Sequence, residues 1–271
     1  MADSSARDDA AFVVAALSGR GHAVRLVLLA SPARDGALGP ADVDVIVPVR
    51  DAAMPGQAAR FAFLDGLGPP VLGGGYLADA LASDRAVLAA VLAADGLPVV
   101  PWCLVRRQDL RDTREVLDRI EATAPYPLWV RSARRGRGPE VRVLDGASLV
   151  EALAALARYE ARLYVCAAAT GKRRPYALLE ERGGVRAAAA RPGPALEAVA
   201  GLAFAAACAR DLALVDVFET EGGELHVQDV DVAPSLSGQS PYVRLWQAAG
   251  RAPDVLIDGL IRAAAARTRL G

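Results

Sequence analysis

Three aspartates in the last third of the chain are the residues best suited to chemistry. Asp216, Asp229 and Asp231 lie in two runs rich in β-branched residues that flank Gly222 and Gly223. A Gly-Gly step between such runs predicts a two-residue hairpin turn, because both positions tolerate positive φ. A turn symmetric about that pair places Asp216 opposite Asp229. Asp231 then shares a face with Asp229, because side chains alternate along a strand.

Carboxylates that face each other across a sheet repel, so this pattern indicates a bound cation. Like charges directly opposite each other destabilise a strand pair. A hard divalent cation such as Mg²⁺ takes oxygen ligands and bridges carboxylates to phosphates. The alternative is a hairpin whose acidic side faces solvent. It is disfavoured because Asp229 and Asp231 stand among valines, and because the strand continues directly into the irregular segment 233–235.

Composition limits the classes of function. The chain has 271 residues and a formal net charge of −1, which argues against a nucleic-acid protein that binds through a basic surface. Its three cysteines are widely spaced in apolar surroundings, which is typical of reduced, buried thiols. We find no apolar signal region at the N-terminus and no run as long as a membrane span. These features predict a soluble, cytoplasmic protein.

Alternating strand and helix patterns predict an α/β and α+β protein with three units. A small N-terminal α/β unit with a parallel sheet covers residues 1–78, an α+β unit covers 79–181, and a second α+β unit with the acidic hairpin covers 182–271. In the first unit we expect helices at 8–18 and 61–67 and strands at 22–29, 43–49 and 71–72.

The two larger units have their own expected elements. In the central unit we expect helices at 77–94, 109–122 and 148–159, the last capped by Ser148, and strands at 99–105, 128–130, 141–144, 163–167 and 176–179. In the last unit we expect a link at 180–194, a helix at 196–210, the hairpin, a loop to Pro241 and a helix from about Pro253.

The order of these segments resembles the D-alanine–D-alanine ligase branch of the ATP-grasp superfamily. The matching stretches are DVDVIVPV, LPVVPWCLV, YPLWVRSARRGRG and, as the most specific, VDVFETEGGELHVQDVDVAPS with LWQAAGRAPDVLIDGLI behind it. The resemblance implies an ATP-grasp fold in which a cleft holds ATP and two metal ions. In that family a carboxylate becomes an acyl phosphate, and an amine then displaces the phosphate.

The resemblance also implies roles for particular residues of this chain. Arg131 and Ser240 are expected to be catalytic, Ser240 because it matches a serine that binds the second substrate's carboxylate. Arg85 and Arg131 match two lysines that contact the ATP phosphates, and the chain's near absence of lysine makes arginine unsurprising there. The expected phosphate flap contains Gly136 and Gly138, and the expected Mg²⁺ ligands are Asp216, Asp229 and Asp231.

Several positions depart from the family pattern. Cys166 and Arg173 stand near the places of glutamates that bind adenine and ribose, and Leu214 takes the place of an arginine that stabilises the oxyanion. Losing a preorganised oxyanion donor typically costs a few kcal/mol of transition-state stabilisation. Residues 180–194 are shorter than the family's closing loop, and Arg7 or Asp8 replaces a glutamate that holds the first substrate's ammonium.

These observations leave two functions open. One is an ATP-dependent ligase of amino acids or peptides, biosynthetic rather than a standard D-alanine–D-alanine ligase. The other is a degenerate, non-catalytic ATP-grasp protein that serves as a binding or partner subunit, since fold does not fix function. A homodimer or a partner enzyme fits either. A nucleic-acid contact through residues 131–142 is disfavoured because no aromatic residue interleaves with the arginines.

Overall fold

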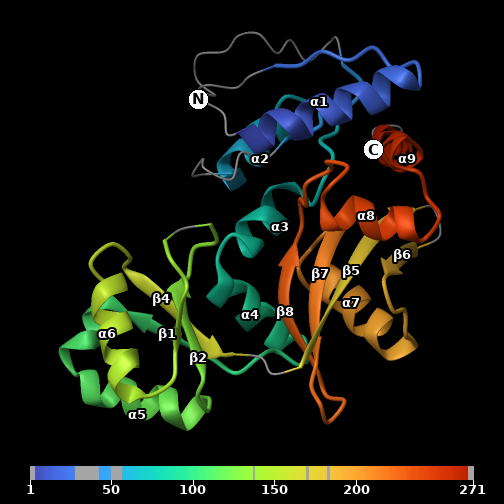
Figure 1. The fold of residues 1–271 in the computed structure, drawn as a ribbon. Coiled ribbons are helices and arrows are strands. Elements are labelled where there is room, and N and C mark those ends of the chain that lie inside the picture. Colours follow the sequence, from blue (N-terminus) through green and yellow to red (C-terminus); the bar gives the residue numbers. More distant parts are fainter. Residues whose placement is uncertain are drawn as a thin grey trace.

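The computed structural model describes residues 4–27, 43–49, 57–136, 138–168, 171–181 and 184–267. Two four-stranded sheets form two lobes that lie beside each other, and the N-terminal helices lie at one end of the second lobe (Figure 1). Within the described residues, no helix is long and apolar enough to cross a membrane.

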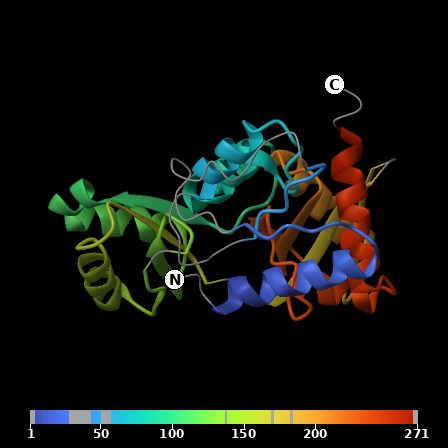
Figure 2. The same cartoon turned by 90° about the horizontal axis from the view of Figure 1, so that it is seen from above.

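The N-terminal part contains less strand than the sequence predicts. Helices α1 (Ser4–Gly19) and α2 (Gln57–Asp65) confirm the expected helices. Residues 22–27 form no strand, so that prediction is wrong there, and residues 28–29 lie outside the described chain. The expected parallel pairing is present as a single bridge between Ile46 and Val71. Helix α1 packs beside the C-terminal helix α9 (Pro253–Arg267), as Figures 1 and 2 show.

The predicted helix 77–94 is divided into two helices by Asp84. Helix α3 (Gly75–Ala82) ends at Ser83, and helix α4 (Arg85–Ala94) starts anew. The Asp84 carboxylate accepts hydrogen bonds from the backbone N–H groups of Ala86 and Val87, both at 3.1 Å. This is an N-cap, which sequence analysis overlooked inside an alanine-rich run. It places Arg85 at the first position of α4.

The first sheet is antiparallel and has the strand order β1-β4-β2-β3. Its elements are β1 (Trp102–Arg106), α5 (Thr113–Thr123), β2 (Leu128–Ser132), β3 (Val141–Val143), α6 (Gly146–Leu156) and β4 (Arg162–Ala167). Helices α5 and α6 share one apolar core with the strands. The cap of α6 is Asp145, which accepts from Ser148 N at 2.8 Å, so the predicted cap at Ser148 is wrong.

The second sheet is also antiparallel, with the order β6-β5-β7-β8. Its strands are β5 (Lys172–Glu181), β6 (Gly184–Ala189), β7 (Leu212–Glu219) and β8 (Leu225–Asp231). Sequence analysis took β6 for part of a link, because its alanines are weak strand formers. It also counted β5 in the central unit, whereas β5 pairs with β7. The domain limits themselves stay a prediction.

Helices cover both faces of the second sheet. Helix α7 (Pro194–Ala206) packs on one face through an alanine-rich side and Phe204. Helices α8 (Pro241–Ala248) and α9 pack on the other through Tyr242, Trp246 and Leu256. Sequence analysis missed α8, although Ser240 at the N-cap and Pro241 at the first turn are start signals. The core under α8 and α9 reaches β5, β6 and the start of β7, and the aspartates further along β7 and on β8 are only partly buried.

The turn between β7 and β8 differs from the predicted one. Thr220 N donates to Glu224 O at 2.8 Å, and Gly223 N donates to Thr220 O at 3.0 Å, which leaves residues 221–223 as the loop. Gly223 has a φ of +82°, and Gly222 has no positive φ. This is the three-residue hairpin loop whose last residue is left-handed, so the predicted two-residue turn is wrong.

A bulge restores the strand pairing that the aspartates need. Val217 pairs with Val227, but Asp216 pairs with Asp229, so the ladder shifts at this point and Gln228 is the extra residue. The predicted opposition of Asp216 and Asp229 is confirmed, although the turn was predicted incorrectly. The longer loop and the bulge shift the pairing in opposite directions and cancel.

Asp211 ties the second sheet to its surroundings. It is buried and has a φ of +60°, which asparagine and aspartate tolerate better than most residues. Its Oδ2 accepts from Gly73 N at 2.8 Å, and its other oxygen pairs with Arg267 of α9. Its own N–H donates to Glu180 Oε2 at 3.0 Å. One residue thus joins β5, α9 and the glycine turn before α3.

We predict that Asp211→Ala lowers the free energy of unfolding by about 2–3 kcal/mol, because it leaves the Gly73 N–H unsatisfied and puts a Cβ residue without a polar side chain at positive φ. Urea denaturation followed by circular dichroism measures this. Asp211→Asn is the matched control and should lose less, because it keeps an acceptor oxygen and the tolerated backbone. Equal stability of all three proteins would contradict this role.

Candidate functional site

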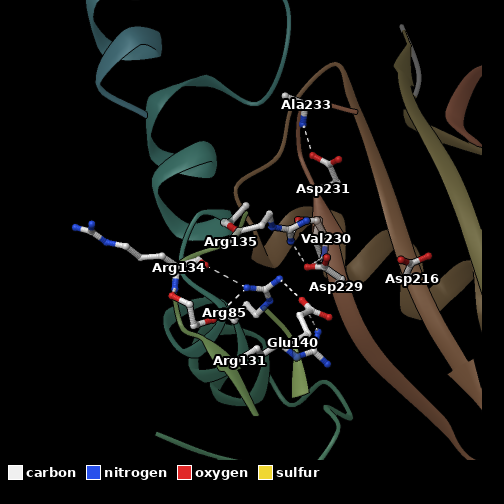
Figure 3. A network of polar contacts seen from close by, with 12 residues as sticks. Arg85, Arg131, Arg134, Arg135, Glu140, Asp216, Asp229, Val230, Asp231 and Ala233 are labelled. Atoms are coloured by element: carbon white, nitrogen blue, oxygen red, sulfur yellow. Dashed lines mark hydrogen bonds and ion pairs between the residues drawn. The ribbon is translucent and has the colours of Figure 1, made fainter. Parts of the chain in front are cut away.

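The three predicted metal ligands lie on neighbouring strands that face the first lobe. Asp216 on β7 and Asp229 on β8 are partners across the sheet, and Asp231 follows on β8 opposite Leu214. Figure 3 shows Asp229 and Asp231 along one strand and Asp216 on the next. The structure therefore brings the two opposed aspartates together and places Asp231 two residues further along β8.

Arginine side chains neutralise the two opposed aspartates. Arg135 Nη2 forms an ion pair with Asp229 Oδ1 and donates to Val230 O at 3.1 Å. Arg173 Nη2 donates to Asp216 Oδ2 at 2.5 Å. The Oδ1 atom of Asp216 is buried and has no hydrogen-bond partner among the described residues. Burial raises the pKa of Asp216 and repulsion from Asp229 adds to this, while Arg173 opposes both.

Arg85 and Arg131 converge on one carboxylate. Arg85 Nη2 lies 2.9 Å from Glu140 Oε1, and Arg131 Nη1 lies 3.5 Å from the same oxygen (Figure 3). Arg85 Nη1 also donates to the backbone oxygens of Ser132 and Arg134, which fixes its position. Burial lowers the pKa of Arg85, and repulsion from Arg131 and Arg135 lowers it further. The two arginines predicted to contact phosphate thus share one anionic partner, and we call this arginine pair the basic pocket.

The glycine loop is tied to the junction between α3 and α4. Gly136 and Gly138 have φ values of +71° and +66°, a conformation that glycine adopts readily. Arg135 N donates to Ser83 O at 2.9 Å, and its Nε donates to Ala82 O at 3.0 Å. Sequence analysis did not single out Arg135 or Glu140. The sequence feature that could have indicated them is a charged residue on each side of the glycine segment.

The donor set fits a magnesium ion that also binds phosphate. Among the described residues, no three histidine, cysteine or acidic side chains are close enough together to hold a metal by themselves. Mg²⁺, however, is usually held by one or two carboxylates together with substrate phosphates and water. Asp216 and Asp229 supply such a pair, and the buried, unpartnered Oδ1 of Asp216 is the kind of oxygen that a cation would satisfy. The residues present fit the ion.

Two of the departures from the family pattern contact the predicted site residues. Cys166 Sγ accepts from Arg131 Nη2 at 3.5 Å, and Arg173 pairs with Asp216. Leu214 stands opposite Asp231, where it adds an apolar side chain beside the acidic strand. The positions where nucleotide-binding glutamates were expected are thus part of the same polar network.

Ser240 has a structural role in addition to its predicted one. It is the N-cap of α8, and its Oγ accepts from Val243 N at 3.2 Å. Its side chain is buried and its hydroxyl can still donate a hydrogen bond. Its predicted contact with a substrate carboxylate stays a prediction.

A small cavity of about 30 Å³ lies between the N-terminal segments and the loop after β8. Its lining is apolar apart from Asp9, backbone and Ser235, and consists of Asp9, Val13, Val47, Pro48, Val49, Leu72, Gly73, Leu212, Ala233, Pro234, Ser235 and Leu236. The sequence has Arg7 or Asp8 where the resemblance implies an ammonium-binding glutamate. Asp9 is the acidic residue that lines the cavity.

Comparison with known proteins relates this chain to D-alanine–D-alanine ligases. The family model described as "D-ala D-ala ligase C-terminus" matches residues 186–262. A D-alanine–D-alanine ligase of Streptomyces coelicolor is 29% identical over 263 residues, covering 83% of this chain and 68% of the relative. One from Methylobacterium sp. (strain 4-46) is 31% identical over 266 residues, with coverages of 83% and 68%.

Solved structures show the same fold. The D-alanine–D-alanine ligase from Bacillus anthracis complexed with ATP superposes with a TM-score of 0.83, covering 98% of this chain and 94% of that chain at 15% identity. The enzyme from Coxiella burnetii gives a TM-score of 0.75 at 23% identity, with coverages of 84% and 69%. The predicted ATP-grasp fold class is confirmed.

We predict that Asp216→Asn raises the melting temperature at pH 7. The pKa of Asp216 is higher in the folded protein than its ordinary value of 3.8, so ionisation penalises the folded state at neutral pH. Asparagine removes that penalty. Below the ordinary value the carboxyl is protonated in both states, and the gain should disappear.

Differential scanning calorimetry between pH 3 and pH 7 measures the difference. Asp118→Asn, an exposed change on α5, is the control and should show no such pH-dependent gain. A gain for Asp216→Asn that persists unchanged in acid, or a loss at pH 7, would contradict the assigned cause.

Proposed function

Because the chain belongs to the D-alanine–D-alanine ligase family of ATP-dependent carboxylate–amine ligases, we propose that it joins two amino acids or small peptides through an acyl phosphate. The observation that carries the proposal is the opposition of a basic pocket, Arg85 and Arg131, to an acidic pair, Asp216 and Asp229. A nucleotide triphosphate with its metal ion needs both kinds of charge in one place.

In this proposal the basic pocket holds the ATP phosphates. A planar guanidinium can bind phosphate oxygens through two parallel hydrogen bonds, so arginine can take the part of lysine with a more directional contact. Gly136 and Gly138 would let the loop backbone approach the phosphates closely. Arg131 extends from β2 and would also act on the acyl phosphate, which makes it the catalytic candidate.

Asp216 and Asp229 would hold Mg²⁺ on the opposite side, together with phosphate oxygens and water. A contribution from Asp231, two residues further along β8, stays a prediction. The ion would neutralise charge on the phosphates as the terminal phosphoryl group is transferred. Arg135 and Arg173 would release the aspartate oxygens, or share them, when the ion binds. Ser240, at the start of α8, would donate its hydroxyl proton to the carboxylate of the second substrate.

We further propose that the substrates differ from the D-alanine pair named for the relatives. Leu214 replaces a charged donor beside Asp231, and residues 184–189 form strand β6 in place of a longer segment. In the family that the chain resembles, these two positions provide an oxyanion contact and a closing loop, which act on the reacting groups and not on the phosphates. A ligase with altered substrate choice is consistent with a retained nucleotide site and changed substrate contacts.

The test is ATP-dependent product formation from pairs of amino acids, followed by ADP release and mass spectrometry. We expect at least one mixed pair to react faster than D-alanine alone. Arg85→Ala should lower kcat/KM by about 100-fold, since it removes a charged phosphate contact, and Arg85→Lys should restore much of it.

Each outcome is informative. If D-alanine alone is the best substrate, the proposed change in substrate choice is wrong. If no pair releases ADP, the alternative of a non-catalytic partner subunit is favoured. Equal activity of Arg85→Ala and the unmodified protein would contradict a role of the basic pocket in binding the ATP phosphates.

A further inference from the structure

Arg135 and Glu140 stand at the two ends of the glycine loop, and each contacts a different wall of the site. Arg135 reaches the acidic strand β8, and Glu140 lies between the arginines of the basic pocket (Figure 3). The loop thus carries a positive charge to the aspartates and a negative charge to the arginines.

The Arg135 guanidinium is held firmly at Asp229. It also donates to Val230 O at 3.1 Å and to Ala82 O at 3.0 Å, so it joins β8 to the end of α3. The group therefore serves as the cation that the acidic strand requires.

The Glu140 carboxylate supplies the negative charge beside Arg85 and Arg131 in the basic pocket. Its Oε1 lies 2.9 Å from Arg85 and 3.5 Å from Arg131, whose side chains are only 17% and 12% exposed. Two buried guanidinium groups repel each other, and an anion between them offsets this repulsion. Glu140 itself is 43% exposed, so water can solvate it when it leaves.

We propose that Arg135 and Glu140 form an intramolecular latch that occupies the sites of the metal and the phosphates and must be displaced by MgATP. The inference rests on the proposed function, since it takes those two sites from it. The guanidinium occupies the carboxylate that would bind the cation, and the carboxylate occupies the arginines that would bind phosphate. Both charges belong to one loop, so releasing them opens the two sites together.

The nucleotide affinity of a Glu140 variant separates a latch from ion contacts that only stabilise the structure. If Glu140 competes with phosphate, its neutral isostere should bind nucleotide more tightly. If Glu140 only orients the arginines, the same change should weaken binding. Glu140→Gln is the decisive variant, because it keeps the size of the side chain and removes the charge.

The experiment is calorimetric titration with ATP, without metal, of the unmodified protein, Glu140→Gln and Glu151→Gln, the last an exposed control on α6. We expect Glu140→Gln to bind ATP about tenfold more tightly, as the loss of a competing charge-assisted contact implies. Glu151→Gln should bind like the unmodified protein. In parallel, Arg135→Gln should bind Mn²⁺ more tightly, as followed by electron paramagnetic resonance.

Hydrogen–deuterium exchange of the peptide spanning residues 134–140 supplies a readout that does not depend on nucleotide. Glu140→Gln should exchange faster there, and Glu151→Gln should not. Weaker or unchanged ATP affinity of Glu140→Gln would overturn the latch. If no protein binds ATP, the proposed ligase function fails, and the Mn²⁺ titration then decides on the latch: tighter Mn²⁺ binding by Arg135→Gln supports competition for the aspartates, and equal or weaker binding rejects it.

Discussion

The repulsion between Asp216 and Asp229 is the constraint on which the site depends. The strand pairing holds the two carboxylates opposite each other, and their side chains are only 13% and 32% exposed, so water screens their repulsion only in part. Each aspartate has acquired a cationic partner, Arg173 in one case and Arg135 in the other. The second of these comes from the other lobe, so the acidic pair also helps to hold the lobes together.

In the basic pocket the repulsion is between two positive charges, those of Arg85 and Arg131. Arg85 is fixed by the Asp84 cap and by backbone oxygens, and Arg131 by its strand, so neither can move away from the other easily. Glu140 offsets their repulsion. A polyphosphate with a divalent cation would satisfy both clusters at once, which is why the family relationship and the charge arrangement support the same function.

The sequence predicts those helices and strands whose residue pattern lies within the element itself. The Asp216–Asp229 pairing was predicted correctly, but only because a longer loop and a bulge cancel, and neither is visible in residue spacing. Strand β6 was missed because alanines gave no strand signal and its pairing with β5 is a tertiary effect. Arg135 and Glu140 were missed because their partners lie 94 and 55 residues away in sequence.

If the acidic pair and the basic pocket together bind a nucleotide and its metal, calorimetric titration with MgATP should detect it, repeated without Mg²⁺ and with Asp229→Asn. We expect binding that strengthens with Mg²⁺ in the unmodified protein and a loss of that Mg²⁺ dependence in Asp229→Asn. Absence of binding at millimolar nucleotide, or the same Mg²⁺ dependence in both proteins, would contradict it.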